Sequence, residues 1–209
     1  MGVIRTHITV YYSTRTRRST LWIILANAGF FGALLAVMFY LRWVSEAWPA
    51  PFHFASLIMV TALTMFAMAA SGTLELASRA LNADDAEPAV RWVAVGIACW
   101  LTFLFLEVVE WVRLIFLLRL GPDTAFGATY LAVMGAHWIA ACVCVCWMTY
   151  VAIDVRKRDI LAVALYSHFL NLVWLVLLFC VYFANATLGE ICGSLRQVFG
   201  VWQERNLTL

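Results

Sequence analysis

Five long apolar segments constrain the fold of this chain more than any other feature. They lie near residues 20–43, 51–80, 89–120, 124–154 and 159–185, and each is long enough to cross about 30 Å of hydrocarbon at about 1.5 Å per residue. The composition agrees, because only 12% of the 209 residues are charged and the mean hydropathy is +0.89. Within lipid a backbone must satisfy its own hydrogen bonds, so segments of this kind form helices. We therefore predict an all-α polytopic membrane protein, a bundle of five transmembrane helices.

The distribution of Lys and Arg around these segments predicts how the bundle is oriented. If residues 1–19 are cytoplasmic, most of the 14 basic residues fall on the inner side. An excess of positive charge marks cytoplasmic loops, so we predict an N-in, C-out topology. This prediction divides the chain into a cytoplasmic N-terminal segment (1–19), a membrane domain (20–185) and an extracytoplasmic tail (186–209).

The tail carries a helical pattern of its own. Apolar residues recur at three- and four-residue steps between Leu188 and Trp202, with polar residues elsewhere. This spacing predicts a C-terminal amphipathic helix. Such a helix lies on the outer membrane surface or against a further subunit of a complex.

Two carboxylates interrupt the apolar run Phe103–Phe116. Glu107 and Glu110 are three residues apart, so they share one face of a helix. A carboxylate at membrane depth is costly and needs a partner or a function. For Glu110, one alternative is a pair with Arg113 on its own helix.

Other polar residues are expected at a similar depth on the next two helices. Counting from the outer helix ends places His137, His168 and Asn171 within roughly 10 Å of the depth of Glu110, at about 1.5 Å per residue. Together with Glu107 and Glu110 they predict an interhelical polar layer. Its role is structural hydrogen bonding, proton or lipid handling, or metal binding. Two histidines and a carboxylate can ligate a metal, but they come from three helices without a local motif. We therefore predict no metal site.

Several other residue classes point away from catalysis. Cys142, Cys144 and Cys146 are two residues apart, so they point to different sides of a helix and are expected to pack, not to bind zinc. The chain has no basic block with interleaved aromatic residues, and no nucleic-acid partner is predicted. The loops between the apolar segments are too short for a soluble catalytic domain.

A second set of residues is predicted to contact lipid or other subunits. Glu75 and Arg79 are an i,i+4 pair near the inner surface. Arg79, Trp111 and the inner loops are expected to hold lipid phosphates and acyl chains. Trp174 is assigned to the same class.

Several motifs resemble subunit III of the haem–copper oxidases. Tyr166–Trp174 (YSHFLNLVW) resembles the last-helix signature YWHFVDVVW, with Asn171 in place of Asp, and Glu110-Trp111 resembles an EW or EY motif. Thr129–His137 (TYLAVMGAH) is similar to a FxxTGFHGLH stretch in which Ala140 replaces the second His. Trp48-Pro49 and Thr73–Leu81 resemble a WPP turn and a TxxxAHRAL helix end. The resemblance covers residues 20–185 in consistent order and is closest to the five-helix bacterial form.

This resemblance implies an accessory, redox-inactive subunit of a terminal oxidase. Such a subunit lies in the bacterial inner membrane, contacts oxidase subunits I and II and binds phospholipid. It contains no catalytic, cofactor or metal site, since haem and copper belong to subunit I, with further copper in subunit II of a cytochrome c oxidase. The acidic residue that the family buries in its first helix corresponds to Ala28 here, so a proton role is not carried over to that position.

Other functions remain open at the level of the sequence. An accessory subunit of a quinol oxidase or of a nitric oxide reductase would carry similar motifs. A small proton-coupled transporter would use Glu107, Glu110 and His137 as a relay.

Overall fold

The computed structural model describes residues 2–45, 56–83, 85–153 and 157–183. These residues form five long α-helices, and no strand is found among them: α1 (Gly2–Val44), α2 (Leu57–Asn82), α3 (Ala86–Val112), α4 (Ala125–Ile153) and α5 (Lys157–Leu178). A π-helical segment continues α3 (η1, Arg113–Leu117) and another continues α5 (η2, Phe179–Phe183). All five α-helices contain a stretch long and apolar enough to cross a membrane. The prediction of a five-helix transmembrane protein is confirmed.

The boundaries differ from the predicted ones in informative ways. The first helix begins at Gly2 and not near residue 20, so the polar N-terminal stretch continues the helix before the span that starts at Arg18. The predicted start of the second helix at residue 51, the Trp48-Pro49 turn and the tail 186–209 lie outside the described residues. Within them, α2 starts at Leu57, directly after the N-cap Ser56. The N-in, C-out orientation stays a prediction.

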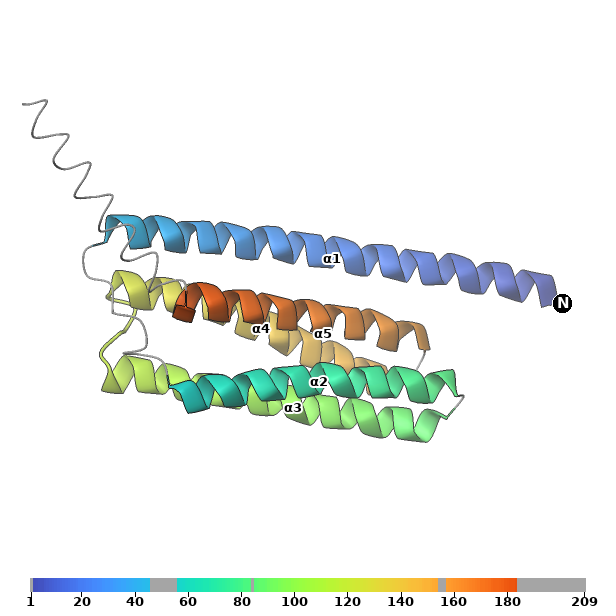
Figure 1. Ribbon diagram of the computed structural model, residues 1–209. Coiled ribbons are helices and arrows are strands. Elements are labelled where there is room, and N and C mark those ends of the chain that lie inside the picture. The colour runs from blue at the N-terminus through green and yellow to red at the C-terminus, as the bar shows by residue number, and fades with distance from the viewer. Residues whose placement is uncertain (1, 46–55, 84, 154–156, 184–209) are drawn as a thin grey trace, which may run out of the picture.

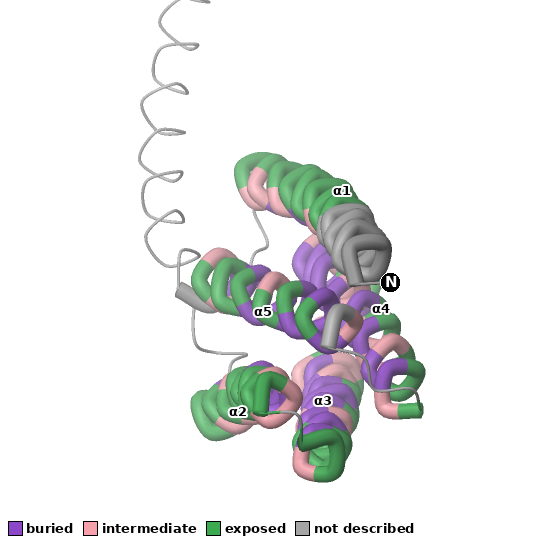
Figure 2. Tube along the Cα trace, turned by 90° about the vertical axis from the view of Figure 1, so that its right-hand side faces the viewer, coloured by how far each residue is buried: buried purple, intermediate pink, exposed green. Residues whose placement is uncertain are grey.

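The helices pack in three groups (Figure 1). α4 and α5 lie between α1 on one side and the α2–α3 hairpin on the other. Helix α5 contacts α1, α2 and α4, and 61% of its apolar window is buried, whereas only 11% of that of α1 is buried. Viewed end-on, the buried positions face the interior and most of α1 is exposed (Figure 2). Helix α5 is therefore central, and α1 is peripheral within this chain.

Close approach between helices depends on small residues at interior positions. The four-residue stripe Ala28, Gly32 and Ala36 of α1 is exposed. Instead, a Cβ added at Gly96 of α3 would lie 2.6 Å from Thr73 Oγ1 of α2 and 2.8 Å from Met148 Cε of α4. Gly96 thus lets three helices meet where a larger side chain would separate them.

The turn between η1 and α4 is tightly constrained. Arg119 adopts a positive φ of 56°, which is uncommon for a residue with a side chain. Thr124 Oγ1 donates to the Gly121 carbonyl and accepts from the Gly127 amide, both at 2.9 Å, so it caps the first turn of α4. At Gly127 an added Cβ would meet the backbone carbonyls of Leu120 and Gly121. This turn therefore requires glycine at residue 127.

Candidate functional site

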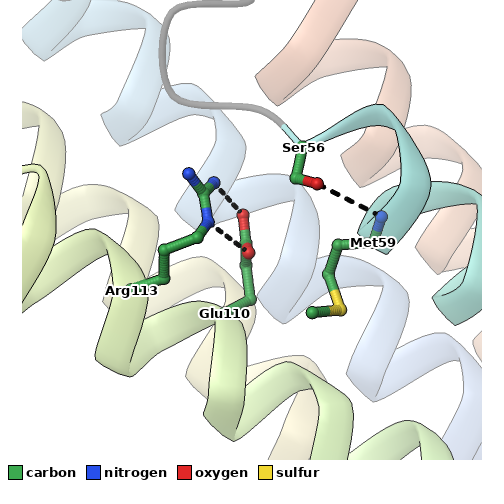
Figure 3. A network of polar contacts seen from close by, with 4 residues as sticks. All are labelled: Ser56, Met59, Glu110 and Arg113. Carbon is green, nitrogen blue, oxygen red and sulfur yellow. Dashed lines mark hydrogen bonds and ion pairs between the residues drawn. The ribbon is translucent and has the colours of Figure 1, made fainter.

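Glu110 is neutralised on its own helix. It is 1% exposed, and Arg113 Nε donates to its Oε2 at 2.8 Å while the terminal Nη2 donates to Oε1 (Figure 3). The guanidinium and carboxylate thus form a two-bond fork. Of the alternatives that the sequence left open, the pair within the helix is the one that forms. The fork lies at the junction between α3 and η1.

Glu107 has a different environment, although it lies one turn away. Its side chain is 2% exposed, and neither carboxyl oxygen has a hydrogen-bond partner. Trp111 stands four residues further along α3, is half-buried and packs against Trp138 of α4, with ring centroids 6.1 Å apart. The Trp138 indole donates to the Leu104 carbonyl at 3.2 Å, which joins α4 to α3 beside Glu107.

His137 lies in the centre of an aromatic cluster. Its ring is fully buried and is surrounded by the rings of Phe31, Trp100, Phe103 and Trp174, at centroid distances of 5.6 to 6.5 Å. These rings come from α1, α3 and α5. The His137 Nε2 atom is 3.2 Å from the Leu170 carbonyl of α5, while Nδ1 has no partner. The contact made by His137 therefore connects α4 to the backbone of α5.

Asn171 belongs to a hydrogen-bond network that links α2, α3 and α5. Its Nδ2 donates to the Ala67 carbonyl at 2.9 Å and to Ser71 Oγ at 2.7 Å. Ser71 Oγ is 2.8 Å from Ser167 Oγ, which also accepts from the Trp100 indole at 3.2 Å. All the side chains of this network are buried, so it holds three helices together in the interior.

The predicted polar layer is therefore only partly formed. Glu107, Glu110, His137 and Asn171 are all buried. The hydrogen bonds of the last three lead to different partners: Glu110 bonds within its own helix, His137 to α5 and Asn171 to α2. His168 is exposed, although it lies only three residues from the buried Asn171 on α5. The expectation that His168 joins the layer stays a prediction.

The residues predicted to contact lipid or other subunits differ in burial: Trp174 is buried, whereas Glu75 and Arg79 are exposed. Trp174 is 1% exposed, its indole donates to Thr64 Oγ1 of α2 at 3.0 Å, and its ring meets Phe103 edge-on. Trp174 is thus packed in the core of the described bundle, and its assignment to lipid or subunit contact stays a prediction. Glu75 and Arg79 form the expected i,i+4 pair at 3.3 Å on the exposed surface.

Four partners in these networks were missed from the sequence: Thr64, Ser71, Trp100 and Ser167. A signal was present, because Thr64 and Ser71 are seven residues apart and so lie on one face of α2 together with Ala67. Small residues on that face let α5 approach. Hydroxyl side chains in membrane helices are common, however, and their partners depend on which helices are neighbours.

Among the described residues, this arrangement joins helices through hydrogen bonds and buries two carboxyl groups. In the described residues no group of three or more His, Cys, Asp or Glu side chains is placed to hold a metal ion. Of the three cysteines on α4, Cys144 is buried, Cys142 is half-buried and Cys146 is exposed. Several of the buried polar side chains bond across helices, whereas both carboxyl oxygens of Glu107 lack a hydrogen-bond partner.

Comparison with known proteins supports the resemblance seen in the motifs. No protein-family profile matches the chain. It is 24% identical to quinol oxidase subunit 3 of Bacillus subtilis over 183 residues, which cover 82% of this chain and 90% of that protein. It is 26% identical to cytochrome c oxidase subunit 3 of Alkalihalophilus pseudofirmus over 164 residues, or 74% and 78% of the two chains. The chain is thus a relative, at modest identity, of the haem–copper oxidase subunit III family.

Proposed function

We propose that this chain is an accessory, redox-inactive subunit III of a respiratory haem–copper terminal oxidase. The observation that carries the proposal is the alignment with a quinol oxidase subunit 3 over 82% of this chain and 90% of that relative. Five membrane-spanning helices accord with it. In this role the chain stabilises the catalytic subunit I, and haem and copper reside in the partner subunits.

Two features of the bundle support a scaffolding role. The buried polar groups are used mainly to join helices, as in the network of Asn171, Ser71 and Ser167. Most residues of α1 are exposed between Arg18 and Val44, the part of the helix whose burial is described. A bundle of this kind can assemble with other membrane subunits without supplying reactive groups.

The proposal is tested by purifying the tagged full-length chain from its native membranes in a mild detergent and recording an absorption spectrum. We expect co-purification of larger subunits and of haem absorbance that is reduced by dithionite. A colourless preparation that contains this chain alone would contradict the assignment and would favour a small proton-coupled transporter.

The electron donor of the complex is a separate question, because the two relatives carry different names. We propose a cytochrome c oxidase, with a quinol oxidase as the alternative. The purified complex is supplied in parallel with reduced cytochrome c and with a quinol, and oxygen uptake is measured. Uptake with the quinol alone would replace the first assignment with the second, and nitric oxide reduction without oxygen uptake would indicate a nitric oxide reductase.

We also propose that the subunit binds phospholipid and supports proton uptake during turnover. The exposed Glu75–Arg79 pair and the half-buried Trp111 are the residues assigned to lipid or subunit contact. An arginine at the membrane surface attracts lipid phosphate. Removal of lipid from the purified complex should lower its thermal stability, and an Arg79→Gln variant should retain less lipid. Full stability after delipidation would contradict this part of the proposal.

A further inference from the structure

Four glutamates fall within the described residues, and three of them share one arrangement. Each of these three has an arginine three or four residues further along its helix and forms an ion pair with it: Glu75 with Arg79, Glu87 with Arg91, and Glu110 with Arg113. Glu107 is the exception. The position four residues after it is occupied by Trp111, and both of its carboxyl oxygens lack a partner.

The location of Glu107 makes this exception costly. The residue is 2% exposed and lies about 15 Å before the Leu117 end of its span, at about 1.5 Å per residue. That places the carboxyl group well inside a hydrocarbon layer about 30 Å thick. An ionised carboxylate there would have to be compensated by a cation, a metal or hydrogen-bond donors.

The groups around Glu107 do not supply this compensation. On α3, Glu110 is already paired with Arg113, whose guanidinium fork is directed to the Glu110 oxygens. On α4, the Cys142 thiol lies within electrostatic range of Glu107, and a thiol is not a cation. The Trp111 Nε1 atom is buried without a partner, so it makes no hydrogen bond to the Glu107 carboxyl. No metal-binding group is found in the described part of the chain.

Within the described part of the chain, no other group neutralises Glu107, which leaves a proton as the way to remove the charge. We propose that Glu107 is a proton-binding site of the bundle, a carboxyl group that is protonated and neutral inside the membrane while Glu110 one turn away is ionised and paired. The two glutamates therefore differ in charge although they share a helix face. This inference concerns the chain's own residues and does not rest on the proposed oxidase function.

Infrared spectroscopy can test the inference directly. The full-length chain is produced with side-chain ¹³C-carboxyl glutamate, reconstituted in lipid bilayers and measured at neutral pH. We expect a carbonyl band of a protonated carboxylic acid that is shifted by the label and shifts again in D₂O. The band should be lost in Glu107→Gln and retained in the matched variants Glu110→Gln and Glu75→Gln.

Two results would overturn the proposal. One is the absence of a protonated glutamate band at neutral pH in the parent protein, and the other is retention of the whole band in Glu107→Gln. If Glu107→Gln does not fold, Glu107→Asp replaces it and is produced with the same labelled glutamate. The aspartate at residue 107 carries no label, so the labelled band of Glu107 should be lost in this variant as well. Circular dichroism of each variant verifies the helical content.

Discussion

The carboxamide of Asn171 on α5 donates both to Ser71 Oγ and to the Ala67 carbonyl of α2, at 2.7 and 2.9 Å. This pairing explains why an amide suits residue 171, where the related motif has an aspartate. A carbonyl oxygen only accepts hydrogen bonds, and an ionised carboxylate cannot donate one. The neighbouring backbone of α2 therefore favours Asn over Asp at this position.

The first prediction follows from that donor requirement. Asn171→Asp should destabilise the bundle by about 1–2 kcal/mol, the size of a lost hydrogen bond between membrane helices, because an acid group would face the Ala67 carbonyl. The matched control is Asn27→Asp, since the Asn27 amide is bonded to the Ile23 carbonyl on its own helix. Unfolding in mixed micelles, followed by circular dichroism, measures both. Equal loss in the two variants would show that the α2–α5 contact is not the cause.

A second prediction concerns the turn that leads into α4. Gly127→Ala should lower stability by about 1–3 kcal/mol, the usual cost of overpacking, because the new methyl group would meet the carbonyls of Leu120 and Gly121. Gly135→Ala on the same helix is the control, since an added Cβ there meets nothing within 4 Å. Alanine favours helices by up to about 1 kcal/mol over glycine, so Gly135→Ala should be neutral or stabilising. The prediction fails if Gly127→Ala also melts at or above the parent temperature.

The ion pair at Glu110 leads to a third prediction. Arg113→Leu should be strongly destabilising, up to about 3–5 kcal/mol for a fully buried pair, because it leaves a carboxylate that is 1% exposed without its partner. The arginine side chain is 26% exposed, so the loss should fall toward the lower part of that range. Arg79→Leu removes an exposed pair of the same kind and should cost less than about 1 kcal/mol.

The combined variant Glu110→Gln with Arg113→Leu separates lost pairing from other damage. If the unpaired charge is the cause, this double variant should recover a large part of the stability that Arg113→Leu loses. The measurement is the melting temperature of the parent protein, of Arg113→Leu, of Arg79→Leu and of the double variant, all in one lipid mixture. No recovery would indicate that Arg113 acts through other contacts at the end of α3.

A fourth prediction tests the core role of Trp174. Trp174→Phe keeps an aromatic ring beside Phe103 but removes the indole donor to Thr64 Oγ1. We expect a loss of about 1–2 kcal/mol. Trp22→Phe is the control, because Trp22 is 70% exposed. If Trp174 contacted lipid instead, the two variants should differ little in stability and Trp174→Phe should alter lipid retention.

Much of the architecture could be read from the chain because it follows from local chemistry. An apolar segment forms a helix when it is long enough to cross the hydrocarbon layer, whatever its neighbours are. The pairing of Glu75 with Arg79 depends only on residue spacing within one helix. The same holds for the Glu110–Arg113 alternative, which the spacing allowed but did not select over a partner on another helix.

Partners across helices could not be read in this way. His168 and Asn171 are three residues apart on α5, yet one is exposed and the other is buried against α2. Counting residues along each helix predicted a similar membrane depth for His168 and Asn171. It carries no information on the direction in which a side chain points relative to neighbouring helices.

The sequence by itself determined five membrane-spanning helices, a buried pair of glutamates and a kinship with oxidase third subunits, because length, hydropathy and motif spacing are properties of the chain. Only the tertiary structure decided that α5 lies at the centre, that Trp174 is a core donor to α2, and that Glu107 lacks a partner while Glu110 has one. The physical reason is that hydrogen bonds and burial depend on the rotation and neighbours of each helix. Those are set by the packing of the whole bundle.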